Sequence, residues 1–369
     1  MTSAMRTSPG GAGRRHPVLR ALLALALLVP TGVLFVQVWT SRSADLAYAA
    51  KERLGVEYLI TLRRVATGLA DNASAVVAGR TVGADALATA VADMGAVDRR
   101  IGGDLRATQR WAGLRTKIES LPVAADPAAG MAAYGEATDL LTALFEAVRT
   151  ESGLVRDPDA DAYFLQDAAA QELPEAVIAA GHLADVLTTA ARARPADRAG
   201  WAGDETVARA AALSPVRDLA DDVRSAVDES RSRTLGEALL SRVDRFRRAI
   251  DALTGMSAVK PDGPRLTTEQ IGSARTEVQA AAADLAATMF TQLDGQLRDR
   301  ADRLRAERLT AVGAMALAVL MAVTPALGVA VRAGRHRRRA TRWAPDERGP
   351  TPPPAGGEQP EREWARAAR

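Results

Sequence analysis

The chain of 369 residues contains no cysteine and few aromatic residues. Without cysteine it has no disulfide, no thiol nucleophile and no Cys-ligated zinc site. Phe, Trp and Tyr together make up only 4% of the residues, whereas alanine is abundant. This composition favours long, closely packed helices over sheets.

The sequence also lacks the common motifs of catalysis. It has no P-loop, no Gly-rich dinucleotide fingerprint, no H-E-x-x-H and no G-x-S-x-G. Between the two long apolar runs described below, His182 is the only histidine, so a His-rich metal site or a Ser/His pair is not expected there. We interpret His182 as an ordinary helix residue and expect no enzyme activity, no catalytic residue and no cofactor.

Alternating acids at Asp157, Asp159 and Asp161 resemble the start of a calcium-binding EF-hand loop. Such a loop needs glycine at its sixth position and glutamate at its twelfth. Here those positions hold Ala162 and Ala168. We therefore expect no metal site, and we interpret the acids as the capped start of a helix.

Positive charge is concentrated at the two ends of the chain. Residues 1–20 carry four arginines, and residues 332–369 carry ten arginines against five acids. Since the whole chain has a net charge of +3, the segment between these ends carries −6. An acidic central segment argues against nucleic acid as a partner.

Two uncharged runs, residues 21–39 and 309–331, are each long enough to cross a bilayer. The first exceeds the apolar region of a typical secretory signal peptide, so we interpret it as an uncleaved anchor. Both runs have their basic flank on the terminal side. The positive-inside rule then predicts a two-span plasma-membrane protein with residues 1–20 and 332–369 in the cytoplasm and residues 40–308 outside the cell.

The region between the spans has the periodicity of helices almost throughout. One apolar stripe follows Tyr58, Leu62, Val65, Leu69 and Val76, and a second follows Ile271, Val278, Leu285, Met289, Leu293 and Leu297. Turn-like segments lie near residues 78–85, 121–130, 192–200 and 259–266. We predict an all-α fold, an elongated antiparallel bundle of about six helices between the two membrane helices. One long bundle and two stacked bundles both fit this pattern.

Pro174 should kink a helix or divide it into two segments, and a kink could open a binding pocket between helices. Trp111 and Trp201 are expected in the core or at an interface.

Two stretches carry a resemblance to a known family. "AKERLGVEYLITLRR" follows the first span, and "DPDADAYFLQDAAAQELPE" begins at Asp157. Both resemble the extracytoplasmic helical sensor region of bacterial methyl-accepting chemotaxis proteins and related transmembrane sensors. The matching positions are Lys51, Glu52, Arg53, Gly55, Glu57, Tyr58, Asp157, Pro158, Asp159, Asp161, Tyr163, Leu173 and Pro174.

The resemblance implies a helical sensor domain, commonly a homodimer, that relays ligand binding through the second span. It makes Arg53, Glu57, Tyr58, Asp161 and Tyr163 candidates for ligand binding or membrane-proximal signalling. By spacing, Arg53 and Glu57 could form an ion pair on one helix face. Gly55 would allow close contact between helices near the membrane.

Only 38 residues follow the second span, without the HAMP linker and signalling domain that such sensors usually carry. We expect no kinase or cyclase activity in this chain, and any output would pass through a partner protein. The predicted function is a membrane sensor that binds a small ligand or an envelope component. The alternative is a structural membrane protein whose helical stalk binds other proteins and no small molecule.

Overall fold

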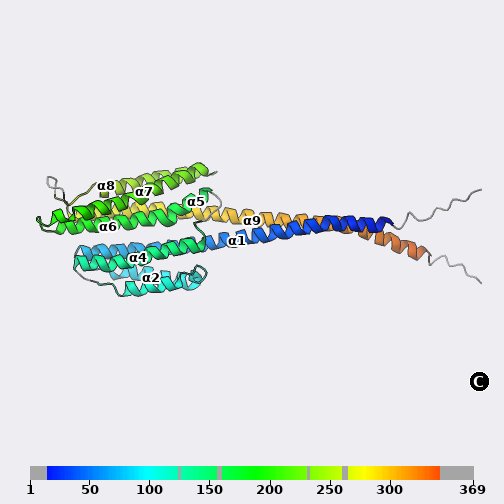
Figure 1. The fold of residues 1–369 in the computed structure, drawn as a ribbon, viewed down its shortest axis with the longest axis horizontal. Helices are drawn as coiled ribbons and strands as arrows, with labels where there is room; N and C mark the ends of the chain where they lie inside the picture. Colours follow the sequence, from blue (N-terminus) through cyan, green and yellow to red (C-terminus); the bar gives the residue numbers. More distant parts are fainter. Residues whose placement is uncertain (1–14, 124–125, 156–159, 231–232, 260–264, 341–369) are drawn as a thin grey trace, which may run out of the picture. The chain divides into compact units, whose positions relative to one another are not determined.

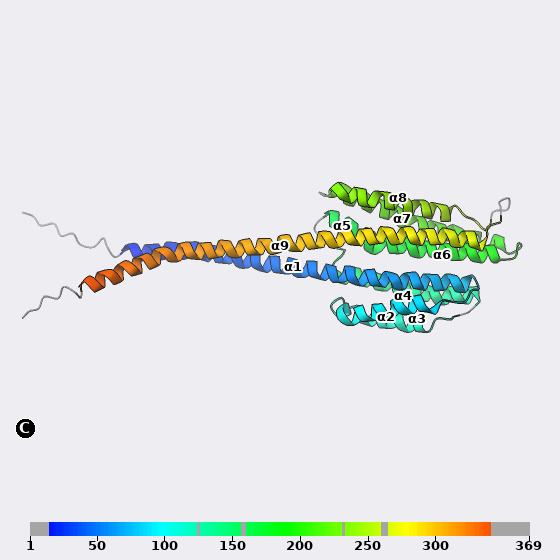
Figure 2. The ribbon, with the colours of Figure 1, turned by 180° about the vertical axis from the view of Figure 1, so that it is seen from behind.

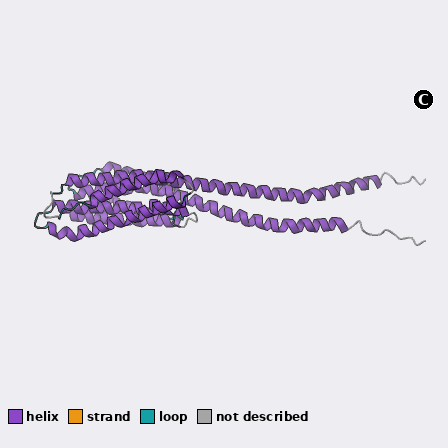
Figure 3. Ribbon diagram, turned by 90° about the horizontal axis from the view of Figure 1, so that it is seen from above, coloured by secondary structure: helices purple, strands orange, loops and turns teal. Residues whose placement is uncertain are grey.

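The computed structural model describes residues 15–123, 126–155, 160–230, 233–259 and 265–340. These residues are almost entirely helical, and none of them forms a strand, as Figure 3 shows. The all-α prediction is therefore confirmed. The described residues divide into two compact units, one drawn from residues 15–35 and 312–340 and the other from the described part of residues 36–311.

The first unit contains the apolar ends of two long helices, α1 (Arg15–Val77) and α9 (Thr268–Ala340). Both helices are long and apolar enough to cross a membrane, judged by length and composition. Large apolar side chains in these segments are exposed, among them Val33, Leu34, Leu317 and Leu320. Such surfaces are unfavourable in water and suit a hydrocarbon environment, where a helix satisfies its own backbone hydrogen bonds.

The second unit combines the remaining parts of α1 and α9 with the helices between them. These helices are α2 (Ala84–Val97), α3 (Thr108–Glu119), α4 (Pro127–Ser152), α5 (Ala160–Asp167), α6 (Leu173–Arg192), α7 (Ala202–Glu229) and α8 (Arg233–Thr254). Within this unit, α2, α3 and α4 lie along α1, whereas α6, α7 and α8 lie along α9 (Figures 1 and 2). The two groups lie side by side and share one hydrophobic core.

Both predicted apolar stripes are buried in this core. Tyr58, Leu62 and Leu69 of α1 are fully buried or nearly so, as are Leu285 and Leu293 of α9. Buried alanines on several helices lie between these larger side chains, which allows the helix axes to approach closely. The composition thus favours helices, and the 3.6-residue periodicity sets the face that each helix buries.

The helix ends agree with the turn-like segments of the sequence. Asp126 caps α4, where its carboxylate accepts hydrogen bonds from the backbone N–H groups of Ala128 and Ala129, each 3.1 Å long. A capping box starts α9. The Thr267 hydroxyl accepts from the N–H of Gln270, and the Gln270 side chain accepts from the N–H of Thr267.

Pro174 divides a helical segment, as the sequence predicts. Since proline has no backbone N–H, it cannot donate the hydrogen bond that an α-helix would require at this position. The preceding residues Ala168–Glu172 form a π-helix (η2), which joins α5 to α6. The start of this segment at Asp157 and Pro158, expected from the sequence, lies outside the described residues, and α5 begins at Ala160.

Gly55 confirms the predicted close contact between helices. A Cβ atom at this position would lie 2.3 Å from the Cβ of Ser152 on α4 and 3.2 Å from a methyl carbon of Leu154. The first of these distances is far shorter than any normal contact between carbon atoms. Glycine is thus required here for steric reasons, because α1 and the end of α4 touch.

Replacing Gly55 with alanine should destabilise the protein by about 1–3 kcal/mol, the usual cost of overpacking a core. Gly113→Ala is the matched control, because nothing lies within 4 Å of a Cβ at Gly113 in α3. It should be neutral or slightly stabilising, since alanine favours helix more than glycine does. Urea unfolding followed by circular dichroism measures both changes. Equal stability of the two variants would contradict the contact.

Candidate functional site

The candidate residues near the start of the bundle form ion pairs between elements. Arg53 pairs with Asp294 of α9, with its Nε 3.2 Å from the carboxylate. Glu57 accepts from Arg100, in the π-helix η1 (Asp98–Gly102), with 3.1 Å between Nη1 and Oε2. The expected ion pair between Arg53 and Glu57 is therefore wrong, because each side chain turns toward a different partner. Both pairs are largely exposed, so each contributes little to stability.

The three remaining candidates are in different environments. Tyr58 is fully buried, and its hydroxyl donates a 3.0 Å hydrogen bond to Asp98. Burial and the neighbouring Asp98 raise the pKa of Tyr58 far above its usual value. Tyr163 on α5 is exposed and packs edge-to-face against Phe164. Asp161 also belongs to α5, but its side chain lies outside the described residues. Tyr58 thus packs in the hydrophobic core. The ligand-binding roles of the five candidate residues stay predictions.

A cavity of about 490 Å³ lies within the second unit, between α1, α4, α6 and α7. Its volume is in the range of small-molecule sites, which are mostly apolar with a few convergent polar groups. The apolar part of its wall includes Ala66, Ala70, Met131, Leu141 and Ile178.

The polar part of the wall contains five ionisable side chains, Tyr134, Asp139, Glu175, His182 and Asp185. No arginine or lysine lines this cavity among the described residues.

Small residues explain why a cavity exists at this place. Ala66, Ala70 and Ala73 recur at steps of four and three along α1, so they lie on one helix face. Gly135 on α4 and Gly181 on α6 border open space, because a Cβ at either position would have no neighbouring atom within 4 Å. Where such short side chains meet between helices, they leave volume that longer ones would fill.

Asp185 is the most buried carboxyl group of the cavity wall. It is only 9% exposed, and its Oδ1 has no hydrogen-bond partner. Burial raises the pKa of Asp185 to about 6, against the opposing effects of the positive charge of Arg275 and a hydrogen bond from Ser74. A buried acceptor without a partner costs free energy, so a ligand that donates a hydrogen bond to it would recover part of that cost.

No sequence motif indicates this cavity. His182, interpreted from the sequence as an ordinary helix residue, lines the cavity close to Asp185 on α6. Pro174, the one hint of a pocket, borders a smaller cavity of about 230 Å³, and the next residue, Glu175, lines both. One sequence feature could have indicated the buried carboxyl group. Asp185 stands next to the apolar residues Leu183, Ala184 and Val186, which are all buried.

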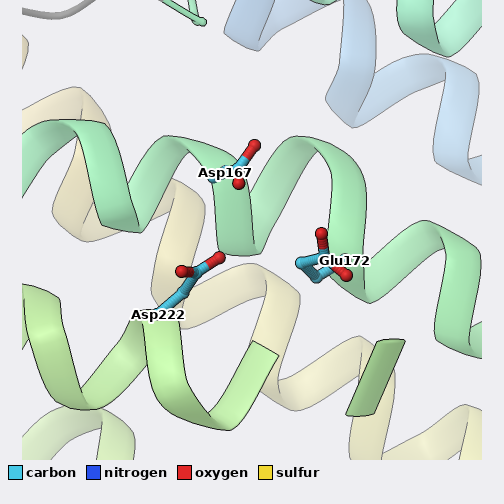
Figure 4. Close-up of side chains that lie close together, drawn as sticks. All are labelled: Asp167, Glu172 and Asp222. Carbon is cyan, nitrogen blue, oxygen red and sulfur yellow. The ribbon is translucent and has the colours of Figure 1, made fainter. Parts of the chain in front are cut away.

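A second polar feature lies where α5 and η2 meet α7. Carboxylate oxygens of Asp167, Glu172 and Asp222 all lie within 4.8 Å of one another (Figure 4). In an α-helix, residues five apart point in directions that differ by about 140°. The wider π-helical turn brings Asp167 and Glu172 closer to one face, and α7 supplies Asp222.

The carboxyl groups of this cluster repel one another when ionised. Burial, followed by the negative charges of Glu175, Asp167 and acids of α7, raises the pKa of Glu172 to about 7. Burial and neighbouring acids likewise raise the pKa of Asp222 to about 6. The expectation of no metal site rested on the absence of a contiguous motif, whereas this cluster draws on three separate elements.

Comparison with known proteins adds no relative. No family model, curated protein or solved structure matches this chain. A function must therefore be inferred from the cavity, the acidic cluster and the two apolar helices.

Replacing Asp185 with asparagine should reduce the dependence of stability on pH. The folded protein holds the proton of Asp185 up to about pH 6, whereas the unfolded chain releases it near pH 3.8. Between these values the folded state binds more protons, so the free energy of unfolding falls as the pH rises. We expect Asp185 to account for about 1–3 kcal/mol of this fall.

Urea unfolding of the wild type and of Asp185→Asn from about pH 4 to about pH 7 measures this difference. Asp139→Asn is the control for the loss of one charge at the cavity, because Asp139 is exposed. If the free energy of unfolding depends on pH in the same way in the wild type and in Asp185→Asn, burial does not raise the pKa of Asp185.

Proposed function

We propose that this chain is a two-span membrane sensor that binds a small ligand in the cavity between α1, α4, α6 and α7. The observation that supports this most is that α1 lines the cavity with Ala66, Ala70 and Ala73 and also contains the apolar run of residues 21–39. The residues of α1 thus include both part of the candidate ligand site and a candidate membrane span. The resemblance of the two sequence stretches to bacterial sensor regions supports the same function.

The charges of the cavity favour a ligand with a positive charge and a small apolar body. Asp139, Glu175 and Asp185 supply carboxyl groups, whereas the rest of the wall is mainly apolar. An anionic ligand would meet these carboxylates without a lysine or arginine on the described wall to pair with it. We therefore propose a small organic cation, such as an amine or quaternary ammonium compound, as the ligand class.

A ligand in this cavity would signal by biasing the position of one helix against its neighbours. It would contact α1 on one side and α4, α6 and α7 on the others, so filling the cavity favours one packing arrangement of these helices. In the proposed topology the basic ends of the chain are cytoplasmic, and a partner protein receives the signal there. The homodimer and the cytoplasmic partner are predictions from the family resemblance.

The alternative function, a stalk that binds other proteins, would require an apolar docking surface. Outside the candidate spans, the large exposed apolar side chains of the described residues are single ones on separate elements. They are Val123, Leu140, Tyr163, Val207 and Leu240. Isolated exposed apolar residues are normal on a soluble surface, so they give this alternative no specific support.

Choline should stabilise the full-length protein in lipid nanodiscs more than 3,3-dimethylbutan-1-ol, its uncharged isostere. A ligand at about 100 times its dissociation constant adds roughly 2.7 kcal/mol to the free energy of unfolding. Thermal unfolding followed by circular dichroism detects such a change, and putrescine serves as a second cationic probe. Asp185→Asn should reduce the effect of both cations.

Gly135→Leu should abolish stabilisation by ligand, because the added side chain occupies the cavity. Gly113→Leu is the matched control on α3, at a position with equally free space that does not line the cavity. Equal effects of choline and its isostere would contradict the proposed ligand charge. No response to any probe by a folded wild type would favour the stalk function.

A further inference from the structure

The cluster of Asp167, Glu172 and Asp222 is separate from the ligand cavity, since none of the three lines it. Figure 4 shows the three side chains close together; Asp167 belongs to α5, Glu172 ends η2 and Asp222 belongs to α7. The feature therefore needs an explanation of its own.

Glu172 gives the strongest reason to expect a ligand at this cluster. Its side chain belongs to a residue that is only 7% exposed, and it forms no hydrogen bond or ion pair with the described residues. Yet its carboxylate lies within 4.8 Å of those of Asp167 and Asp222. A buried carboxylate next to other carboxylates is costly unless it is protonated or meets a cation.

The protein supplies only part of the positive charge that the cluster requires. Nη1 of Arg149 on α4 lies 2.7 Å from Oδ1 of Asp167. No ion pair to Glu172 or Asp222 occurs among the described residues. Arg149 thus pairs with one of the three carboxylates, and the negative charge of the other two has no ion pair among the described residues.

We propose that Asp167, Glu172 and Asp222 together bind one Ca²⁺ ion. Calcium takes oxygen ligands at 2.3–2.6 Å, so two oxygens on one ion can lie up to about 5 Å apart. The 4.8 Å limit on the carboxylate oxygens fits within that distance. Magnesium, with ligands at 2.0–2.1 Å, allows only about 4 Å and demands stricter geometry.

The donor set is consistent with this choice of ion. All three ligands are carboxylates, the hard oxygen donors that calcium prefers, and no histidine or cysteine takes part. Three protein ligands leave coordination positions for water, which is typical of weaker sites. The ion would hold η2 against α7 and would replace the repulsion between carboxylates with attraction.

Isothermal titration of the full-length protein with CaCl₂ tests the site. The protein is first treated with chelator and is held in nanodiscs of zwitterionic lipid, because anionic lipids bind calcium themselves. We expect one ion per chain with a dissociation constant of about 10⁻⁴–10⁻³ M, the range of weak extracellular sites. Glu172→Gln and Asp222→Asn should each weaken binding at least tenfold.

Asp221→Asn is the matched control, since this neighbour of Asp222 is exposed and pairs with Arg224. It should bind calcium as the wild type does. Loss of binding in Glu172→Gln can be distinguished from misfolding. This variant removes repulsion between carboxylates, so it should unfold at a higher temperature than the calcium-free wild type.

Three outcomes would overturn the proposal. The first is no binding up to about 10 mM calcium, ten times the weakest expected constant. The second is wild-type affinity in Glu172→Gln, and the third is magnesium binding as tight as calcium binding.

Discussion

The missing backbone N–H of Pro174 shapes the part of the bundle on which both candidate sites depend. It interrupts the α-helical hydrogen-bond pattern, and the chain accommodates it as the π-helix Ala168–Glu172. This turn brings Asp167 and Glu172 toward Asp222. It also leads directly into α6, whose residues Glu175 and Asp185 line the cavity. One local constraint thus influences two polar features in an otherwise alanine-rich core.

Small side chains determine what the rest of the helices can do. At Gly55, α1 approaches the end of α4 so closely that even a methyl group does not fit. Farther along α1, alanines at 66, 70 and 73 instead leave an open volume against α4, α6 and α7. α1 is therefore closely packed against α4 near Gly55 and borders an open cavity near Ala70. That combination suits a helix whose position responds to whatever fills the space.

The sequence was sufficient for features that depend on local chemistry. Apolar periodicity identified the buried faces of α1 and α9, and Gly55 and Pro174 had the expected effects. It failed where the partner of a side chain lies far along the chain. Spacing alone suggested a pair of Arg53 with Glu57, whereas the tertiary partners are Asp294 and Arg100. The cavity and the acidic cluster are each formed by residues of several helices, so no contiguous sequence motif predicts them.

The proposed function requires that a ligand in the cavity change the position of α1 against its neighbours. One of these neighbours is α9, whose Glu307 pairs with Arg42 of α1. Because the chain has no cysteine, a single pair of spin labels can be introduced by Ala44→Cys and Arg303→Cys, both at exposed positions of the second unit. Double electron–electron resonance in nanodiscs then measures the distance distribution between them. Choline should shift this distribution, and Asp185→Asn should reduce the shift at the same choline concentration. An unchanged distribution in the wild type with choline bound would contradict the account.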